Sequence, residues 1–364
     1  MPRRVRNEIL PAAGGSTVRM RAFGILPDRT PFAVILVLLV LSGTRGWAAP
    51  LPSEDAVGVS FFIEPLLQKG FGGTSYDLSF DEGGGVTGLS RLEFPQLSLE
   101  AGALLGLSIN RGTRREWLFE AGITHSTFPM SGTMNDYDWT QYAGYPKVPF
   151  SYTYSDDSTV SWHASLEVAW TFATVNPLSF SLLGMYRYQS ISHVEDSYTG
   201  WQYVWNPSYP PNGAWDLYTF SYPTPDVLEY TLTSHTIGLG FLADLQAFPG
   251  FHIELRACYT PVYVSDQDDH KLRTKLSTAS GWGNGLYADL KAVYYLPRIA
   301  AGVTPYLALD GEVIYYVVDT TQTQYWYGNA DAGNGAPQGT LITGVGHVIT
   351  STQYQLGLRI GFSF

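Results

Sequence analysis

The sequence predicts an all-β protein, a transmembrane antiparallel β-barrel of about ten strands with long external loops and short periplasmic turns. Three observations lead to this fold: an N-terminus typical of export, 25 Tyr and 10 Trp in 364 residues, and apolar residues at every second position in many segments. Aromatic rings with a polar edge are favoured at membrane–water interfaces, where transmembrane barrels carry girdles of them. Beyond the N-terminal run, no stretch approaches the roughly 20 apolar residues of a membrane helix, which excludes a multi-span helical protein.

The N-terminus has the three parts of an export signal. Basic residues precede an apolar run at 32–41, and small residues follow as far as Ala49. A basic region, a short apolar region and a small-residue cleavage site are typical of a signal peptide. We therefore expect a signal peptide at 1–48, with Met20 as an alternative start, and an outer-membrane β-barrel domain at 49–364.

The charge of the mature chain excludes one class of partner. Removal of residues 1–48 takes away seven Arg and two acidic residues, and it leaves 14 basic and 30 acidic residues, a net charge of −16. Nucleic acid is not expected as a partner, because phosphates need a basic surface. An acidic surface attracts cationic peptides. Cys258 is the only cysteine, so neither an internal disulfide nor a cysteine metal site can form.

The C-terminal segment shows the two-residue alternation most clearly. Its apolar positions are Tyr354, Leu356, Leu358, Ile360, Phe362 and Phe364. Polar or small residues lie between them, and in a strand the two sets face opposite sides. An apolar lipid-facing set with a polar or small lumen-facing set is typical of a membrane barrel. The alternative is an edge strand of a soluble sandwich, which the export signal and the aromatic content disfavour.

Similar segments recur along the mature chain and give an even strand number, as single-chain bacterial barrels have. The ten expected strands are 57–80, 89–109, 115–126, 160–172, 178–192, 230–247, 251–264, 285–296, 303–318 and the C-terminal segment. Short turns alternate with long polar connections. The long connections are 129–155, 193–225, 266–279 and 319–349, and we expect them to lie together on the external rim.

Two acidic clusters follow strands on the long-loop side. The first holds Asp136 and Asp138, and the second holds Asp266, Asp268 and His270. A His beside an Asp can take a proton from water, while opposite carboxylates hold that water and shift each other's pKa. Two other interpretations stay open: an exposed acidic loop, and a calcium site, since Asp-x-Asp spacing suits hard cations. Neither cluster continues with the Gly and distal Glu of a full EF-hand loop.

The two clusters together resemble the omptin family of outer-membrane proteases. The motifs are Met-x-Asp-x-Asp-Trp at 134–139 and Asp-x-Asp-x-His at 266–270, and residues 83–94 resemble the family's first loop and second strand. The resemblance covers the mature chain in order, from the signal to the aromatic C-terminus. It implies an aspartic-type endopeptidase that uses water, without an acyl-enzyme, a metal or another cofactor. It also implies an active site that faces outward from the bacterial outer membrane.

The family's roles can be carried to five positions of this chain. The resemblance implies that Asp136 and Asp138 are a catalytic carboxylate couple and that Asp268 and His270 are a catalytic dyad. It implies that Asp266 lines the pocket for a basic side chain before the scissile bond. A carboxylate there would pair with Arg or Lys through charge-assisted hydrogen bonds.

The chain departs from the family at two places. Where the family has a Glu that completes the basic pocket, this sequence offers Ser75 or Asp77. Where the family has a basic cluster for lipopolysaccharide, only Arg187 lies near 188–192, which weakens the case for lipopolysaccharide dependence. The expected partners are peptide or protein substrates, mainly cationic, and outer-membrane lipid. The alternative function is a non-catalytic porin, adhesin or structural barrel.

Overall fold

The computed structural model describes residues 58–110, 115–206, 208, 214–300, 302–328 and 336–364. The expected signal peptide lies outside these ranges. Within them, no helix is long and apolar enough to cross a membrane. The described chain forms one 13-stranded sheet and a 3-10 turn. The elements are β1 (Val59–Gly83), β2 (Val86–Pro95), β3 (Ser98–Ile109), β4 (Trp117–Ser126), β5 (Met130–Tyr142), β6 (Val148–Val175), β7 (Leu178–Asn206), β8 (Ala214–Tyr222), β9 (Leu228–Phe248), β10 (Phe251–His270), η1 (Lys271–Arg273), β11 (Lys275–Tyr295), β12 (Thr304–Trp326) and β13 (Leu341–Ser363).

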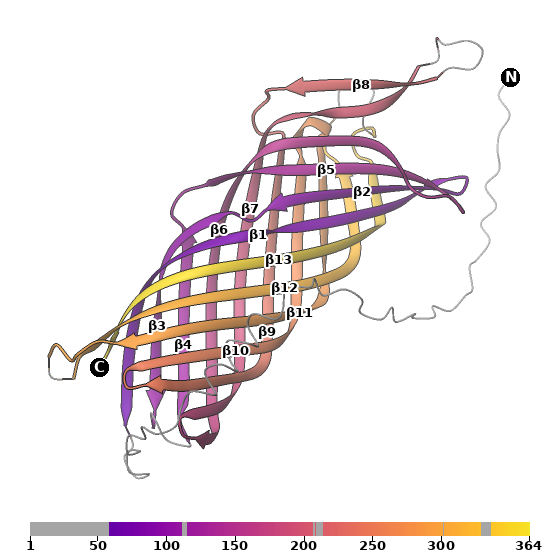
Figure 1. Cartoon of the computed structure of the whole chain (residues 1–364). Coiled ribbons are helices and arrows are strands. Elements are labelled where there is room, and N and C mark those ends of the chain that lie inside the picture. The colour runs from indigo at the N-terminus through magenta and orange to yellow at the C-terminus, as the bar shows by residue number, and fades with distance from the viewer. Residues whose placement is uncertain (1–57, 111–114, 207, 209–213, 301, 329–335) are drawn as a thin grey trace. The chain divides into compact units, whose positions relative to one another are not determined.

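Ten of these strands close into a ring of antiparallel pairs (Figure 1). The order around the ring is β1, β3, β4, β6, β7, β9, β10, β11, β12 and β13. β13 pairs with β1 from Phe62↔Ser363 to Ser79↔Gly346, and this pairing closes the ring. Closure gives the backbone N–H and C=O groups of β1 and β13 hydrogen-bond partners. They need these partners in lipid, because no water is present there to replace them. The predicted barrel of about ten strands is confirmed.

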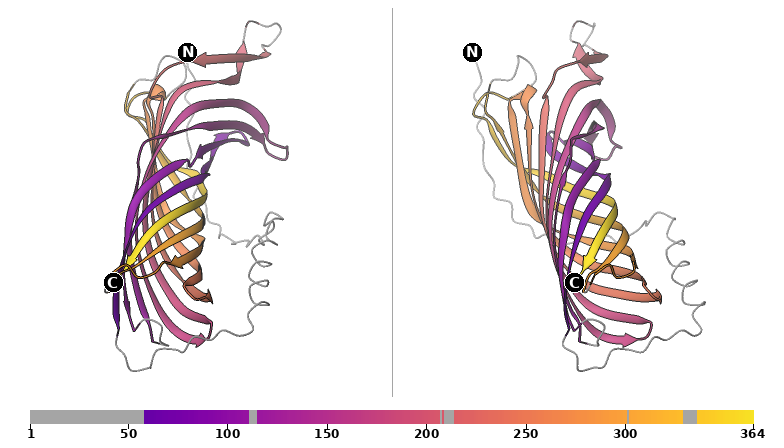
Figure 2. Two further views of the ribbon diagram at one scale, coloured as in Figure 1. Left: turned by 60° about the vertical axis from the view of Figure 1, so that its left-hand side comes forward. Right: turned by 90° about the vertical axis from the view of Figure 1, so that its left-hand side faces the viewer.

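The remaining strands, β2, β5 and β8, extend the wall at one end (Figure 2). β1 pairs with β3 up to Gly70 and with β2 from Gly73 onward. In the same way, one part of β6 pairs with β4 and the other part pairs with β5. One part of β7 pairs with β9 and the other part pairs with β8. Pro95 and Pro129 stand at two of the changes of partner, where a missing N–H interrupts a ladder.

The long connections differ from the expectation in their structure. Most residues of the predicted external loops are strand: β5 and part of β6, the upper part of β7 with β8, and the ends of the hairpins β10–β11 and β12–β13. Both acidic clusters therefore lie on strands of the wall. Above the membrane both faces of a strand can carry polar residues, so the alternation that identifies a lipid-facing strand is lost there.

The outward-facing residues show where the apolar band ends. On β13, Leu356 and Ile360 point outward and are exposed, while Gln355 and Arg359 point into the lumen and are buried. The predicted alternation of the C-terminal segment is confirmed. On β10 the outward-facing positions are apolar or aromatic up to Tyr263, and they are polar from 265 to 269. The second acidic cluster thus lies beyond the apolar band.

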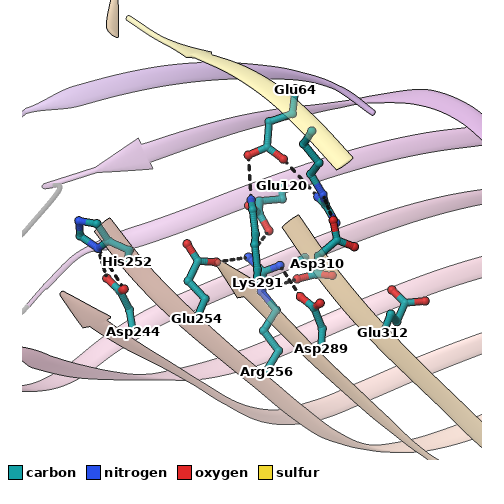
Figure 3. A network of polar contacts seen from close by, with 12 residues as sticks. Glu64, Glu120, Asp244, His252, Glu254, Arg256, Asp289, Lys291, Asp310 and Glu312 are labelled. Atoms are coloured by element: carbon teal, nitrogen blue, oxygen red, sulfur yellow. Dashed lines mark hydrogen bonds and ion pairs between the residues drawn. The ribbon is translucent and has the colours of Figure 1, made fainter. Parts of the chain in front are cut away.

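Ion pairs fill the lumen within that band (Figure 3). The guanidinium of Arg256 lies 2.9 Å from Glu120, 3.0 Å from Glu254, 3.2 Å from Asp289 and 3.6 Å from Glu167. A second centre is formed by a buried carboxylate, Glu64, which contacts Lys291 at 2.8 Å and Arg359 at 3.2 Å. Such a network satisfies charges that burial would otherwise penalise.

Replacement of Arg256 by Met should destabilise the barrel, because four carboxylates would then lack their shared cation. Removal of one partner of a buried pair typically costs about 3–5 kcal/mol. The measurement is the urea concentration at which refolded protein loses its heat-resistant gel migration. Arg298→Met, which changes an exposed Arg between β11 and β12, is the matched control and should leave the midpoint unchanged. Equal midpoints for the two variants would contradict the role of the network.

Candidate active site

A cavity at the extended end of the barrel brings residues of both acidic clusters together. Its volume is about 280 Å³. Asp136 and Asp138 reach it from β5, and His270 reaches it from the last position of β10. The other lining residues are Met134, Ser151, Thr153, Ser155, Tyr198, Gln202, Tyr218, Phe220, Tyr222, Val227, Leu228, Leu272 and Arg273. The structure thus places three of the five predicted site residues in one cavity.

The carboxylate couple lies on one face of β5, because residues two apart on a strand point the same way. Ser151 Oγ donates a hydrogen bond to Asp138 Oδ2 at 2.5 Å, and Ser90 Oγ donates one to Asp136 Oδ1 at 3.3 Å. Burial, together with the neighbouring charge of Asp138, raises the pKa of Asp136 to about 8. At neutral pH the couple therefore holds a proton on Asp136.

His270 has the opposite electrostatic environment. Burial, and then the positive charges of Arg273 and Lys275, hold its pKa well below the ordinary value of 6.5. Lys275 is the cross-strand neighbour of His270, and its side chain is buried. The imidazole is therefore neutral at physiological pH and able to accept a proton. Its Nδ1 has no hydrogen-bond partner among the described residues.

Asp268 is buried beside the cavity but does not line it. Its Oδ2 accepts a hydrogen bond from the Tyr76 hydroxyl at 2.5 Å, and burial raises its pKa. Its Oδ1 has no partner among the described residues, as is also true of Nδ1 of His270. The predicted dyad is therefore not joined by a hydrogen bond here, although both side chains project from the inner face of β10, two positions apart.

Asp266 lies deeper in the barrel and does not line the cavity. Its Oδ2 is hydrogen-bonded to His347 Nε2 at 2.9 Å and accepts a longer bond from the Tyr230 hydroxyl at 3.4 Å. Its Oδ1 has no partner within the described part of the chain. The role of Asp266 in selecting a basic side chain stays a prediction.

Neither candidate for the second pocket carboxylate points into the barrel. Ser75 and Asp77 occupy outward-facing positions of β1, and Asp77 accepts a hydrogen bond from Arg91 Nε at 2.6 Å. The lumen position between them belongs to Tyr76, which is fully buried. Neither Ser75 nor Asp77 therefore supplies, inside the barrel, the carboxylate by which the family completes its basic pocket. The reason is strand alternation, which turns the residues on both sides of a lumen-facing residue outward.

An aromatic layer beneath the cavity was not predicted from the sequence. Phe94 stacks on Tyr230 with a centroid distance of 4.4 Å, and Tyr76 lies 5.4 Å from Tyr230. His347 and His193 pack at the edges of this layer, 5.1 Å from Tyr76 and 5.0 Å from Phe94. The hydroxyls of Tyr76 and Tyr230 hold Asp268 and Asp266. The sequence carried no local signal for this layer, because register brings Tyr76 to Asp268 across 192 residues.

The geometry gives little support to the calcium interpretation of the clusters. Asp136 and Asp138 are hydrogen-bonded to Ser hydroxyls, and Asp266 is bonded to His347. In the part of the chain that the structure describes, no group of three or more His, Cys, Asp or Glu side chains could hold a metal ion.

Comparison with known proteins shows a fold. No family model matches the chain, and no curated protein matches its sequence. The outer membrane protease OmpT from Escherichia coli superposes with a TM-score of 0.64 at 14% identity, over 86% of this chain and 99% of that chain. The outer membrane protein OprG from Pseudomonas aeruginosa has a TM-score of 0.27 at 10% identity, over 85% of this chain and 96% of that one. The chain has an omptin-like outer-membrane β-barrel fold.

The two shifted pKa values predict the pH profile of any hydrolysis that uses His270 as base and Asp136 as acid. Activity needs neutral His270, so the acidic limb should lie well below the ordinary His value of 6.5. It also needs protonated Asp136, so activity should fall as the pH rises through about 8. The measurement is kcat/KM of peptide cleavage against pH. An acidic limb near pH 6.5 would show that burial does not lower the pKa of His270.

Proposed function

We propose that this protein is an outer-membrane endopeptidase whose cavity faces outward from the bacterial outer membrane. The observation that carries the proposal is the convergence on one cavity of His270 and Asp136, whose surroundings shift their pKa values in opposite directions. A neutral His270 is available as a base, while Asp136 keeps a proton beside an ionisable partner. Environments that push the pKa values of neighbouring groups apart are typical of acid–base catalysis. The fold shared with the protease OmpT supports the same proposal.

In the proposed reaction His270 removes a proton from a water molecule that lies between the imidazole and the carboxylate couple. The water oxygen forms a bond to the carbonyl carbon of the scissile peptide. The proton on Asp136 forms a hydrogen bond to the carbonyl oxygen, where negative charge develops. His270 then gives its proton to the leaving nitrogen as the carbon–nitrogen bond breaks. Asp138, held by Ser151, receives a hydrogen bond from the same water.

Asp268 completes the proposed machinery by orienting His270. Its Oδ1 and the Nδ1 of His270 are both buried and both lack a partner among the described residues. Catalytic hydrogen bonds are often long in a free enzyme and tighten when substrate binds. A hydrogen bond between these two atoms in the substrate complex would fix the tautomer in which Nε2 accepts the proton from water.

The proposed substrates are cationic peptides. The mature chain carries a net charge of −16, which draws cations toward the rim over a distance set by salt. Asp266 Oδ1 is one of several buried carboxylate oxygens without a hydrogen-bond partner among the described residues, and we assign it to a basic side chain of the substrate. A diffusion porin is a poorer alternative, because the ion pairs of Arg256 and Glu64 cross the lumen within the membrane band.

His270→Ala should lower kcat for peptide cleavage by about 10²–10⁴-fold and leave the barrel folded, because it removes the general base. The matched control is His252→Ala. His252 also pairs with an Asp, Asp244 at 3.1 Å, but it lines a different cavity at the other end of the barrel. Cleavage by the control should equal that of the wild type. Wild-type cleavage by folded His270→Ala protein would remove His270 from the mechanism.

Asp266→Asn should reduce cleavage after Arg or Lys far more than cleavage after neutral residues. Loss of the partner of a buried charge costs about 2–5 kcal/mol. The matched control is Asp77→Asn on the outer face of β1, which should not alter the preference. The measurement is a ratio of kcat/KM values for paired peptides that differ at one residue. An unchanged ratio in Asp266→Asn would withdraw this role and leave the proposal for His270 intact.

A further inference from the structure

The wall of the cavity opposite the carboxylates is aromatic. We propose that this wall is a second substrate subsite, which binds a large apolar or aromatic side chain about four residues from the scissile bond. The inference rests on the proposed peptidase function and adds a specificity that the acidic residues do not provide. The subsite consists of Tyr198, Tyr218, Phe220 and Tyr222, which line the cavity, and these residues are called the aromatic wall below.

Sheet register connects the aromatic wall to the carboxylates. β5, β6, β7 and β8 are neighbouring strands, and residues that are paired across them lie in rows on the cavity face. One row runs Asp136↔Thr153↔Gly200↔Phe220. The next row runs Asp138↔Ser151↔Gln202↔Tyr218. Each row therefore passes from a carboxylate on β5, across small polar residues, to an aromatic ring on β8.

The aromatic wall is preformed and open to the cavity. Tyr198 lies 5.0 Å from Tyr222 and 5.5 Å from Phe220, measured between ring centroids. The hydroxyls of Tyr218 and Tyr222 are 3.1 Å apart, which fixes the two rings relative to each other. Tyr218 is 47% exposed and Tyr222 is 41% exposed, although both line the cavity. Rings that are held in place but not covered lose little entropy when they bind a partner.

A glycine leaves the ring of Phe220 without a neighbouring β7 side chain. Gly200 stands in the row between Thr153 and Phe220, and a Cβ at this position would lie 2.1 Å from the backbone oxygen of Tyr152. A larger residue is therefore excluded, so no β7 side chain stands beside Phe220 in this row. A substrate side chain can reach the aromatic carbon of Phe220 from the cavity, which Phe220 lines.

The other apolar residues of the cavity favour an apolar occupant over a cationic one. Val227, Leu228 and Leu272 also line the cavity, so an apolar side chain would meet their apolar surface as well as the rings. Arg273 also lines the cavity and carries a positive charge that opposes a Lys or Arg at this subsite. Without that charge, the rings alone could also attract a cation.

The spacing of strands sets the position of the subsite along the substrate. Neighbouring strands lie about 4.8 Å apart, so the three steps from β5 to β8 span about 14 Å. An extended peptide advances about 3.3 Å per residue. A peptide that crosses these strands with its scissile bond over Asp136 therefore presents a side chain to Phe220 about four residues away.

The test is a series of otherwise identical cleavable peptides in which one Phe is moved along an Ala background. One peptide, with Phe about four residues from the scissile bond, should stand out. Its kcat/KM with wild-type protein should exceed that of the all-Ala peptide by about tenfold or more. Phe220→Ala and Tyr218→Ala should each bring that ratio close to one. Leu217→Ala is the matched control, because Leu217 lies on the opposite face of β8 and is 58% exposed; it should keep the wild-type ratio.

Two results would overturn the inference. The first is a wild-type enzyme that cleaves the peptide with Lys at this position as well as the peptide with Phe. The second is a Phe preference that both wall variants retain. If no peptide is cleaved at all, the proposed function fails instead, and the subsite is then judged by fluorescence anisotropy of the dye-labelled Phe peptide. Tighter binding of that peptide than of the all-Ala peptide, lost in Phe220→Ala, supports the subsite, and equal binding overturns it.

Discussion

The antiparallel pairing of β1 with β13 is the interaction on which the rest of the structure depends. It closes the ring, so that every strand in the membrane band has a partner on both sides. In lipid an unpaired backbone group costs several kcal/mol, so an open sheet could not stand there. Closure also gives each strand an inside and an outside. That division sends Arg359 and Glu64 into the lumen and leaves Leu358 and Ile360 for lipid.

The same division of faces continues beyond the membrane band and creates the candidate site. β5 and β10 carry their acidic residues on the inner face, where the surrounding strands reduce the exposure of these side chains to water. Burial then pushes the pKa of Asp136 upward, whereas burial and two nearby cations push that of His270 downward. The residues proposed as base and acid thus owe their opposite pKa shifts to their places in the fold. The ion pairs around Arg256 lie in a different part of the lumen, within the apolar band.

The membrane half of the fold could be predicted from the sequence, because lipid imposes alternation and alternation is visible in residues such as Leu356 and Gln355. The upper half could not, because water on both faces removes that signal and the strands there look like polar loops. The shared cavity of Asp136 and His270 was expected from the position of both acidic clusters on the long-loop side, and the family resemblance strengthened that expectation. The partners of Asp266 and Asp268 could not be expected at all, since His347 and Tyr76 are brought to them by register across 81 and 192 residues.

The most direct measurement of the central claim is a double-mutant cycle between the base and the acid. It compares kcat/KM for the wild type, His270→Ala, Asp136→Ala and the double variant, all with heat-resistant migration retained. If both side chains act on one water molecule, the second substitution should cost far less in a protein that already carries the first, because a unit that has lost one part is already inactive. Losses that simply add would show that the two residues act separately and would contradict a shared catalytic cavity.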